Sequence, residues 1–147
     1  MISGLLALVL AAVFSGAAIY VLIVEHPARA ALDDRAALME WKPAYRRGAA
    51  TQGTIALVAT LLGALAWWQS REHAFALGAL LSLLPWPWTL LVIRPTNDRL
   101  LAASPDDAGP ETRKLLARWA RLHAVRVVLG CLAVVAFVLA LVAPDTI

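Results

Sequence analysis

Four long apolar stretches dominate the chain. None of them contains Asp, Glu, Lys, Arg or His, and each has at least 18 residues: Met1–Val24, Ala49–Ser70, Ala74–Ile93 and Val127–Pro144. About 20 apolar residues, at a helical rise of about 1.5 Å each, cross a hydrocarbon core roughly 30 Å thick. The pattern therefore predicts an all-α fold, a four-helix transmembrane bundle. Its spans are expected near residues 2–25, 44–68, 74–93 and 122–143.

Prolines close to the span ends predict where two of the helices stop. Pro27 follows the first apolar stretch and Pro95 follows the third. A residue before proline is disfavoured in the helical region, so these spans are expected to end at His26 and Arg94. Short amphipathic helices are expected in the segments that follow these two spans.

Further signals mark helix starts and bends between the spans. Asp33 is a suitable N-cap for a short amphipathic helix that runs to Trp41, and Pro43 suits the first turn of a new helix. Pro85 and Pro87, in the segment LLPWPWTLL, are expected to kink the third span. Pro110 begins a long helix that continues through the fourth span.

The two halves of the chain follow one plan, which favours a duplicated helical hairpin. The segment VEHPARAAL after the first span resembles VIRPTNDRLL after the third. The pair Trp41 and Tyr45 has the same spacing as the pair Trp119 and His123. Two spans per half would make the repeats parallel, related by a pseudo-twofold axis along the membrane normal.

Small side chains predict where the spans approach one another. Ala12 and Gly16 recur at a spacing of four residues in the first span, and Ala56, Ala59 and Gly63 form a similar group in the second. Small residues let helix backbones pack closely in a membrane. We therefore expect both groups to face neighbouring helices.

Composition fixes the class of protein. The chain is 61% hydrophobic with a mean hydropathy of +0.73, which excludes an ordinary soluble domain. Four spans use most of the 147 residues, so residues 1–147 are expected to form a single membrane domain. The net charge of +3 comes from residues that flank the spans, so we expect contact with anionic lipid and no nucleic-acid partner. The oligomeric state stays open.

The basic residues predict the orientation in the membrane. All of the 13 Lys and Arg residues except Arg71 lie in or beside the segments 26–48 and 94–121. Basic residues stay in the cytoplasm during insertion. We therefore predict a multi-pass protein of the cell inner membrane, with these two segments cytoplasmic and both termini outside.

Polar and aromatic side chains gather at the same end of the predicted bundle. His26 closes the first span, and His123 lies about one turn before the fourth apolar stretch, so the two imidazoles are expected at one depth. Trp119, His123, Arg126 and Gly130 recur at spacings of four, three and four, which places them on one helical face. His73 lies in the short turn at the opposite end and is not a candidate.

A metal site is one interpretation of this cluster. His26 and His123 together with Glu25 or Asp98 would make a set of two histidines and one carboxylate. Haem ligation by the two histidines is equally open in geometry. Neither interpretation has a local sequence motif, and the cofactor, whether a metal, haem or none, stays open.

The chain resembles a known family at four segments: GAAIYVLIVEHPARAAL, EWKPAYRRG, RPTNDRLL and ETRKLLARWARLHAVR. These are similar to the hallmarks of the anthrone-oxygenase-like family of small four-span membrane proteins. The resemblance covers nearly the whole chain. It implies an oxidation of anthrones to anthraquinones, or a related role. By position, it places the family's pattern on His26, Pro27, Trp41, Tyr45, Arg47, Asn97, Arg99, Trp119, His123 and Arg126.

Two functions agree with these residues. The first is a membrane oxygenase or oxidoreductase that uses O2 on a lipophilic aromatic or quinol-like substrate and requires no cofactor. Its candidate catalytic residues are His26, His123, Arg126 and Tyr45, with a histidine as the base and an arginine stabilising an oxyanion. Its candidate substrate-binding residues are Trp41, Arg47, Trp88, Asn97, Arg99 and Trp119. The second function is that of a non-catalytic binding or accessory protein.

The orientation can be tested with fusions to a reporter that is active only outside the cytoplasm. A fusion after Asp145 should be active and a fusion near Asp106 should be inactive, because the basic segments stay inside. An inactive fusion after Asp145 together with an active one near Asp106 would reverse the predicted orientation.

Overall fold

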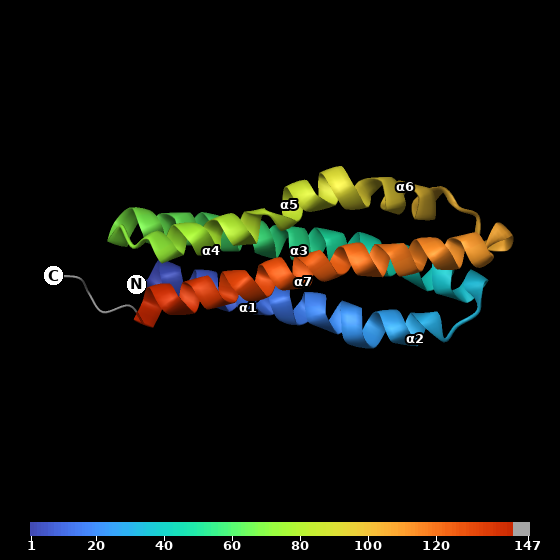
Figure 1. The fold of residues 1–147 in the computed structure, drawn as a ribbon, viewed down its shortest axis with the longest axis horizontal. Coiled ribbons are helices and arrows are strands. Elements are labelled where there is room, and N and C mark those ends of the chain that lie inside the picture. The colour runs from blue at the N-terminus through green and yellow to red at the C-terminus, as the bar shows by residue number, and fades with distance from the viewer. Residues whose placement is uncertain (143–147) are drawn as a thin grey trace.

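The computed structural model describes residues 1–142, which fold into four helical rods side by side (Figure 1). The first rod comprises α1 (Ile2–Tyr20), a π-helical turn and α2 (His26–Ala30), and the second is α3 (Asp34–Ser70). The third comprises α4 (His73–Leu83), α5 (Pro85–Trp88), a second π-helical turn and α6 (Arg94–Ala102). After a 3-10 turn (Pro105–Asp107), the fourth rod is α7 (Pro110–Val142). The predicted all-α four-helix bundle is confirmed.

All four rods are long and apolar enough to cross a membrane. Around the bundle, α1 packs against α3 and α7, and α4 packs against the same two helices on the other side. The N-terminus of the chain and the end of α7 lie at one end of the bundle, while α2, α6 and the starts of α3 and α7 lie at the other (Figure 1). We call the latter the basic end, defined by residues 26–48 and 94–121.

The first and third rods continue through their prolines, so the prediction that the helices stop at His26 and Arg94 is wrong. A π-helical turn precedes each proline: Val21–Glu25 before Pro27, and Thr89–Ile93 before Pro95. Each turn is closed by an N–H that donates to the carbonyl five residues back. The wider turn accommodates a proline, which has no N–H and would clash with an α-helical carbonyl. The equivalent position of the two turns supports the duplicated hairpin.

The second rod is one helix rather than two. Asp33 is its N-cap as predicted, and the carboxylate accepts a hydrogen bond of 2.8 Å from the Ala36 N–H. Pro43 lies inside α3 and does not begin a new helix, which corrects the sequence interpretation. The residues before the proline are held by packing, since the Trp41 side chain is completely buried. Tertiary contacts thus maintain the helix across a residue that weakens it locally.

Two basic side chains at the basic end join the halves of the chain reciprocally. Lys42, from the first half, donates to the Ala103 carbonyl (2.6 Å) at the end of α6. Arg113, from the second half, donates to the Ala30 carbonyl (2.9 Å) at the end of α2. The last carbonyls of a helix have no partner within the helix, so both contacts satisfy groups that would otherwise need water.

The small residues of the second span face the bundle, but those chosen in the first span do not. Ala56, Ala59 and Gly63 are buried as predicted. Ala12 and Gly16 are exposed, and the buried face of α1 carries a different set of small residues that includes Ala7, Ala11 and Ala18. Because α1 has small residues on more than one face, their spacing alone does not identify the packed face.

Gly78 provides a test of this packing. A Cβ atom there would lie 2.5 Å from the ring of Phe137, which is completely buried, so a methyl group forces the ring to move. Gly78→Ala should lower the free energy of unfolding by about 1–3 kcal/mol, measured by thermal unfolding in detergent. Gly16→Ala is the control, because within residues 1–142 no atom of another segment lies within 4 Å of its Cβ position. Equal stability of the two variants would contradict the packing.

Candidate functional site

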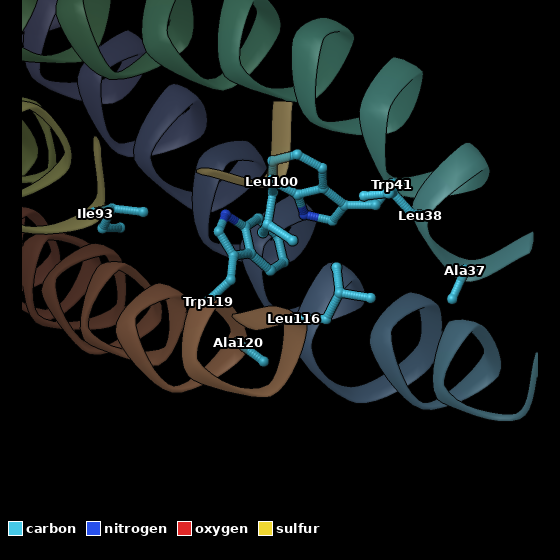
Figure 2. Packing of buried hydrophobic residues seen from close by; sticks show 8 residues of the cluster. All are labelled: Ala37, Leu38, Trp41, Ile93, Leu100, Leu116, Trp119 and Ala120. Carbon is cyan, nitrogen blue, oxygen red and sulfur yellow. The ribbon is translucent and has the colours of Figure 1, made fainter. Parts of the chain in front are cut away.

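Four rings from α3 and α7 form the centre of the basic end. Trp41 stacks on Tyr45 with ring centres 4.8 Å apart, and Trp119 stacks on His123 at 5.1 Å. Each pair is separated by four residues, which brings its members to one helix face. The two indoles meet edge to face at 5.8 Å, so the stacks join into one cluster (Figure 2). The equal spacing predicted from the sequence therefore corresponds to equivalent stacks.

Aliphatic side chains enclose the two indoles. Leu38 and Leu100 are completely buried, and Leu116 lies on the same α7 face one turn before Trp119 (Figure 2). Trp41 has no exposed surface, and its indole nitrogen has no hydrogen-bond partner among residues 1–142. The cluster is therefore held mainly by apolar packing, which fixes the ring positions.

His123 is held in one orientation by the first rod. Its Nε2 lies 3.1 Å from the Ala18 carbonyl oxygen, and only 2% of the residue is exposed. A carbonyl can only accept, so Nε2 carries the hydrogen in this contact. In the neutral imidazole Nδ1 is then an acceptor, and it is buried with no partner in the described part of the chain. Within residues 1–142, the ring thus presents an unprotonated nitrogen with no hydrogen-bond donor.

Arg126 is a buried cation without a carboxylate. It is 8% exposed, donates to the Gln52 side-chain oxygen at 3.1 Å, and lies 5.6 Å from the centre of the Phe14 ring. No ion pair involves it within residues 1–142, and its Nε has no acceptor there. Burial of an uncompensated charge is unfavourable, so the site is suited to an anionic ligand.

Tyr45 and Asn97 form a polar contact between the halves. The Asn97 amide donates to the Tyr45 hydroxyl oxygen at 3.0 Å, and Asn97 is 2% exposed. Because the hydroxyl accepts this bond, its own hydrogen is available for another acceptor. The Asn97 carbonyl oxygen has no partner among the described residues. Asn97 thus lies inside α6 and positions a side chain of α3.

Arg29 is a site residue that the sequence analysis missed. It is almost completely buried, it pairs with the carboxylates of Glu25 and Glu40, and it lies 5.9 Å from the centre of the Trp119 ring. Its position four residues after Glu25 was the available signal, but the helix end predicted at His26 concealed it. Gln52 was also missed, although a Gln inside an apolar span is itself unusual.

An inner cavity of about 70 Å³ lies beside the aromatic cluster. We define it by its polar and aromatic walls, which are Glu25, Arg29, Trp41, Tyr45, Gln52, Trp119, His123 and Arg126. The structure therefore brings together six of the predicted residues, Glu25, Trp41, Tyr45, Trp119, His123 and Arg126. A seventh, Asn97, contacts the cavity through Tyr45.

His26 does not line the inner cavity. It is half-buried and lines a separate cavity of about 60 Å³ with Arg113 and Leu116, and Arg29 lies in the wall of both. Its Nδ1 is buried and has no partner among residues 1–142. The two histidines therefore occupy neighbouring cavities rather than the single one expected from their similar depth.

Other candidates lie outside the cavity. Arg47 and Arg99 are exposed. Asp98 is exposed and pairs with Arg94 at 3.6 Å. The Trp88 indole N–H donates to the Leu122 carbonyl at 3.0 Å, and the ring packs against the aromatic cluster without lining the cavity.

The candidate metal ligands do not come together. Across residues 1–142, no group of three His, Cys, Asp or Glu side chains is arranged to hold a metal ion. Glu25 pairs with Arg29, and Asp98 with Arg94, so both carboxylates already have cationic partners.

Comparison with known proteins identifies the family. The sequence profile described as "Anthrone oxygenase" matches residues 41–136, which include most of the walls of the inner cavity. The "Anthrone oxygenase tpcL" of Aspergillus fumigatus is 42% identical over 57 residues, which cover 37% of this chain and 34% of that protein. The matched segment thus spans about a third of the length of this relative, and no solved structure matches. The match over residues 41–136 shows that the chain belongs to the anthrone oxygenase family.

Proposed function

We propose that the protein is a membrane oxygenase that uses O2 to oxidise a flat, lipophilic aromatic substrate of the anthrone type at the inner cavity. The observation that carries this proposal is the pair His123 and Arg126. Within one turn of α7, it combines a buried nitrogen free to accept a proton with a buried cation that has no carboxylate partner among residues 1–142. Family membership supports the same reaction class.

The reaction needs a base, an anion site and O2. The CH2 carbon of an anthrone loses a proton, and the remaining negative charge is shared with the ring oxygen as a phenolate. This carbon then gives electrons to O2 and forms a C–O bond. The resulting peroxide takes back the proton, and the hydroperoxide loses water to become a ketone. One anthrone and one O2 thus give one anthraquinone and one water.

In this scheme His123 is the base. Its Nε2–H is held by Ala18, so Nδ1 is the nitrogen that accepts the proton from the substrate carbon. Stacking on Trp119 fixes the plane of the imidazole. A positioned imidazole of this kind contributes about 10²–10⁴-fold to a proton transfer.

Arg126 and Tyr45 stabilise the phenolate. The guanidinium supplies positive charge in a buried site, where a charge interacts more strongly than in water. The Tyr45 hydroxyl has a hydrogen to donate, because Asn97 occupies one of its acceptor positions. Both side chains line the inner cavity. The phenolate that forms when His123 removes the proton is therefore stabilised within the same site.

We also propose the orientation predicted from the charges. The basic end faces the cytoplasm of a cell that inserts this protein in its inner membrane, which places the inner cavity near the cytoplasmic membrane surface. A lipophilic substrate then reaches the site from the bilayer.

His123→Ala tests the assignment of the base. The assay uses a hydroxylated anthrone and protein in nanodiscs, and the rate of anthraquinone formation in empty nanodiscs is subtracted. The remaining rate should fall by about 10²-fold or more in the variant, because it lacks the positioned base. His73→Ala is the matched control, since His73 is exposed at the opposite end of the bundle. Full activity of His123→Ala would refute this role, and no activity in the unmodified protein would favour a non-catalytic binding protein.

Arg126→Met separates function from stability. Anthrone oxidation should fall by about 10²–10³-fold because the phenolate loses its counter-charge. The melting temperature in detergent should stay the same or rise, because the change removes a buried charge without a carboxylate partner.

Arg29→Met is the comparison for stability. It should lower the melting temperature, because Glu25 and Glu40 lose their common partner. A large fall in the melting temperature of Arg126→Met would instead mean that Arg126 maintains the fold.

A further inference from the structure

A second concave surface lies on the outside of the bundle, next to the inner cavity. It has a volume of about 240 Å³ and lies between α3 and the segment that begins with α5. We call it the outer groove, and its walls include Tyr45, Gly53, Ala56, Trp86, Leu90 and Arg126. Trp86 and Leu90 are both exposed on the outside of the bundle.

The outer groove exists because the third rod changes course. α4 packs against α3, but the α-helix is interrupted at Leu84, and α5 begins at Pro85. From α5 onward the rod is displaced relative to α4 (Figure 1). Trp86 reaches back across the gap, and its indole N–H donates to the Gly53 carbonyl at 3.2 Å. The indole therefore presents a fixed apolar surface with its polar group already bonded.

Size decides which of the two spaces can hold a ring system. A cavity of roughly 150 Å³ is known to hold a single benzene molecule. The inner cavity, at about 70 Å³, is smaller than this, whereas the outer groove, at about 240 Å³, is larger and is lined by the exposed residues Trp86 and Leu90. A molecule of three fused rings therefore fits the outer groove and not the inner cavity.

The two spaces share a wall. Tyr45, Ala49 and Arg126 line both of them. A ring system in the outer groove thus places one edge beside the only cation in that groove, and small Ala49 leaves this edge close to the inner cavity. A lipid acyl chain would also fill an apolar groove, but it has no anionic group for Arg126.

We infer that the outer groove is the substrate-binding site. A flat polycyclic phenol or its phenolate enters from the bilayer between α3 and α5, with its rings against Trp86 and its oxygen on Arg126. The CH2 carbon lies across the middle ring from this oxygen, so the ring is oriented with that carbon toward His123, one turn of α7 before Arg126. This inference rests on the proposed function and adds where the rings lie and how they arrive.

The test measures binding and turnover separately in nanodiscs. The binding probe is 1,8-dihydroxyanthraquinone, which is not oxidised further in the assay, and turnover uses the corresponding anthrone. Gly53→Leu places a side chain in the groove, where a Cβ atom alone makes an ordinary contact of 3.6 Å with Trp86. Gly16→Leu is the matched control because its Cβ position faces open space.

Gly53→Leu should weaken probe binding and raise KM by at least about tenfold, while Gly16→Leu changes neither. Leu90→Trp, compared with Leu91→Trp, provides a second pair: both leucines are exposed, but only Leu90 lines the groove. If Gly53→Leu does not fold, the leucine pair provides the test: Leu90→Trp should weaken probe binding and raise KM by at least about tenfold, and Leu91→Trp should change neither.

The outcomes distinguish the inference from the proposed function. Probe binding that depends on Gly53 or Leu90 without anthrone oxidation supports the groove as a binding site and rejects the enzyme. Anthrone oxidation that is unaffected by the groove variants supports the enzyme and overturns the groove. Failure of the unmodified protein to bind the probe also overturns it and favours lipid as the occupant.

Discussion

The edge-to-face contact between Trp41 and Trp119 joins the two halves of the chain, and the positions of the other polar side chains depend on it. Each indole carries a second ring one turn further along its own helix, Tyr45 on α3 and His123 on α7. Because the indoles are enclosed by leucines, a shift of one helix relative to the other would open voids in a closely packed cluster. The relative position of the Tyr45 phenol and the His123 imidazole is therefore fixed, although the two residues belong to different hairpins.

Simple sequence features predict the fold, but they do not predict where the helices continue through a proline. Four uncharged stretches and the position of the basic residues were sufficient to predict a four-helix bundle with its polar groups at one end. The stops expected at His26, Arg94 and Pro43 were wrong because a local preference of one residue competes with the packing of a whole rod. Proline inside a helix has a local free-energy cost, and this cost is what the sequence patterns describe. In this structure, π-helical turns and the packing of buried neighbours offset it.

The candidate site was predictable where residues share a helix face and unpredictable where contacts cross the bundle. Trp119, His123 and Arg126 came from spacing along α7, and all three line the inner cavity. The separation of His26 from that cavity, and the contacts of Arg126 with Gln52 and Phe14, depend on how α1, α3 and α7 are placed around one another. No spacing within one segment contains that information. Exposed residues such as Arg47 and Arg99 match the family pattern, and nothing in the geometry assigns them to the cavity.

The two π-helical turns have a consequence for the way this architecture changes over time. A π-helical turn contains one residue more than an α-helical turn, so it is the trace that a single-residue insertion leaves in a helix. Deleting one residue from either turn would rotate everything after it by about 100° around the rod axis. Arg29 follows the first turn by four residues and Asn97 follows the second by the same number, so each would leave its present partners. The number of residues in the two π-helical turns is thus constrained, even at positions where one apolar side chain can replace another.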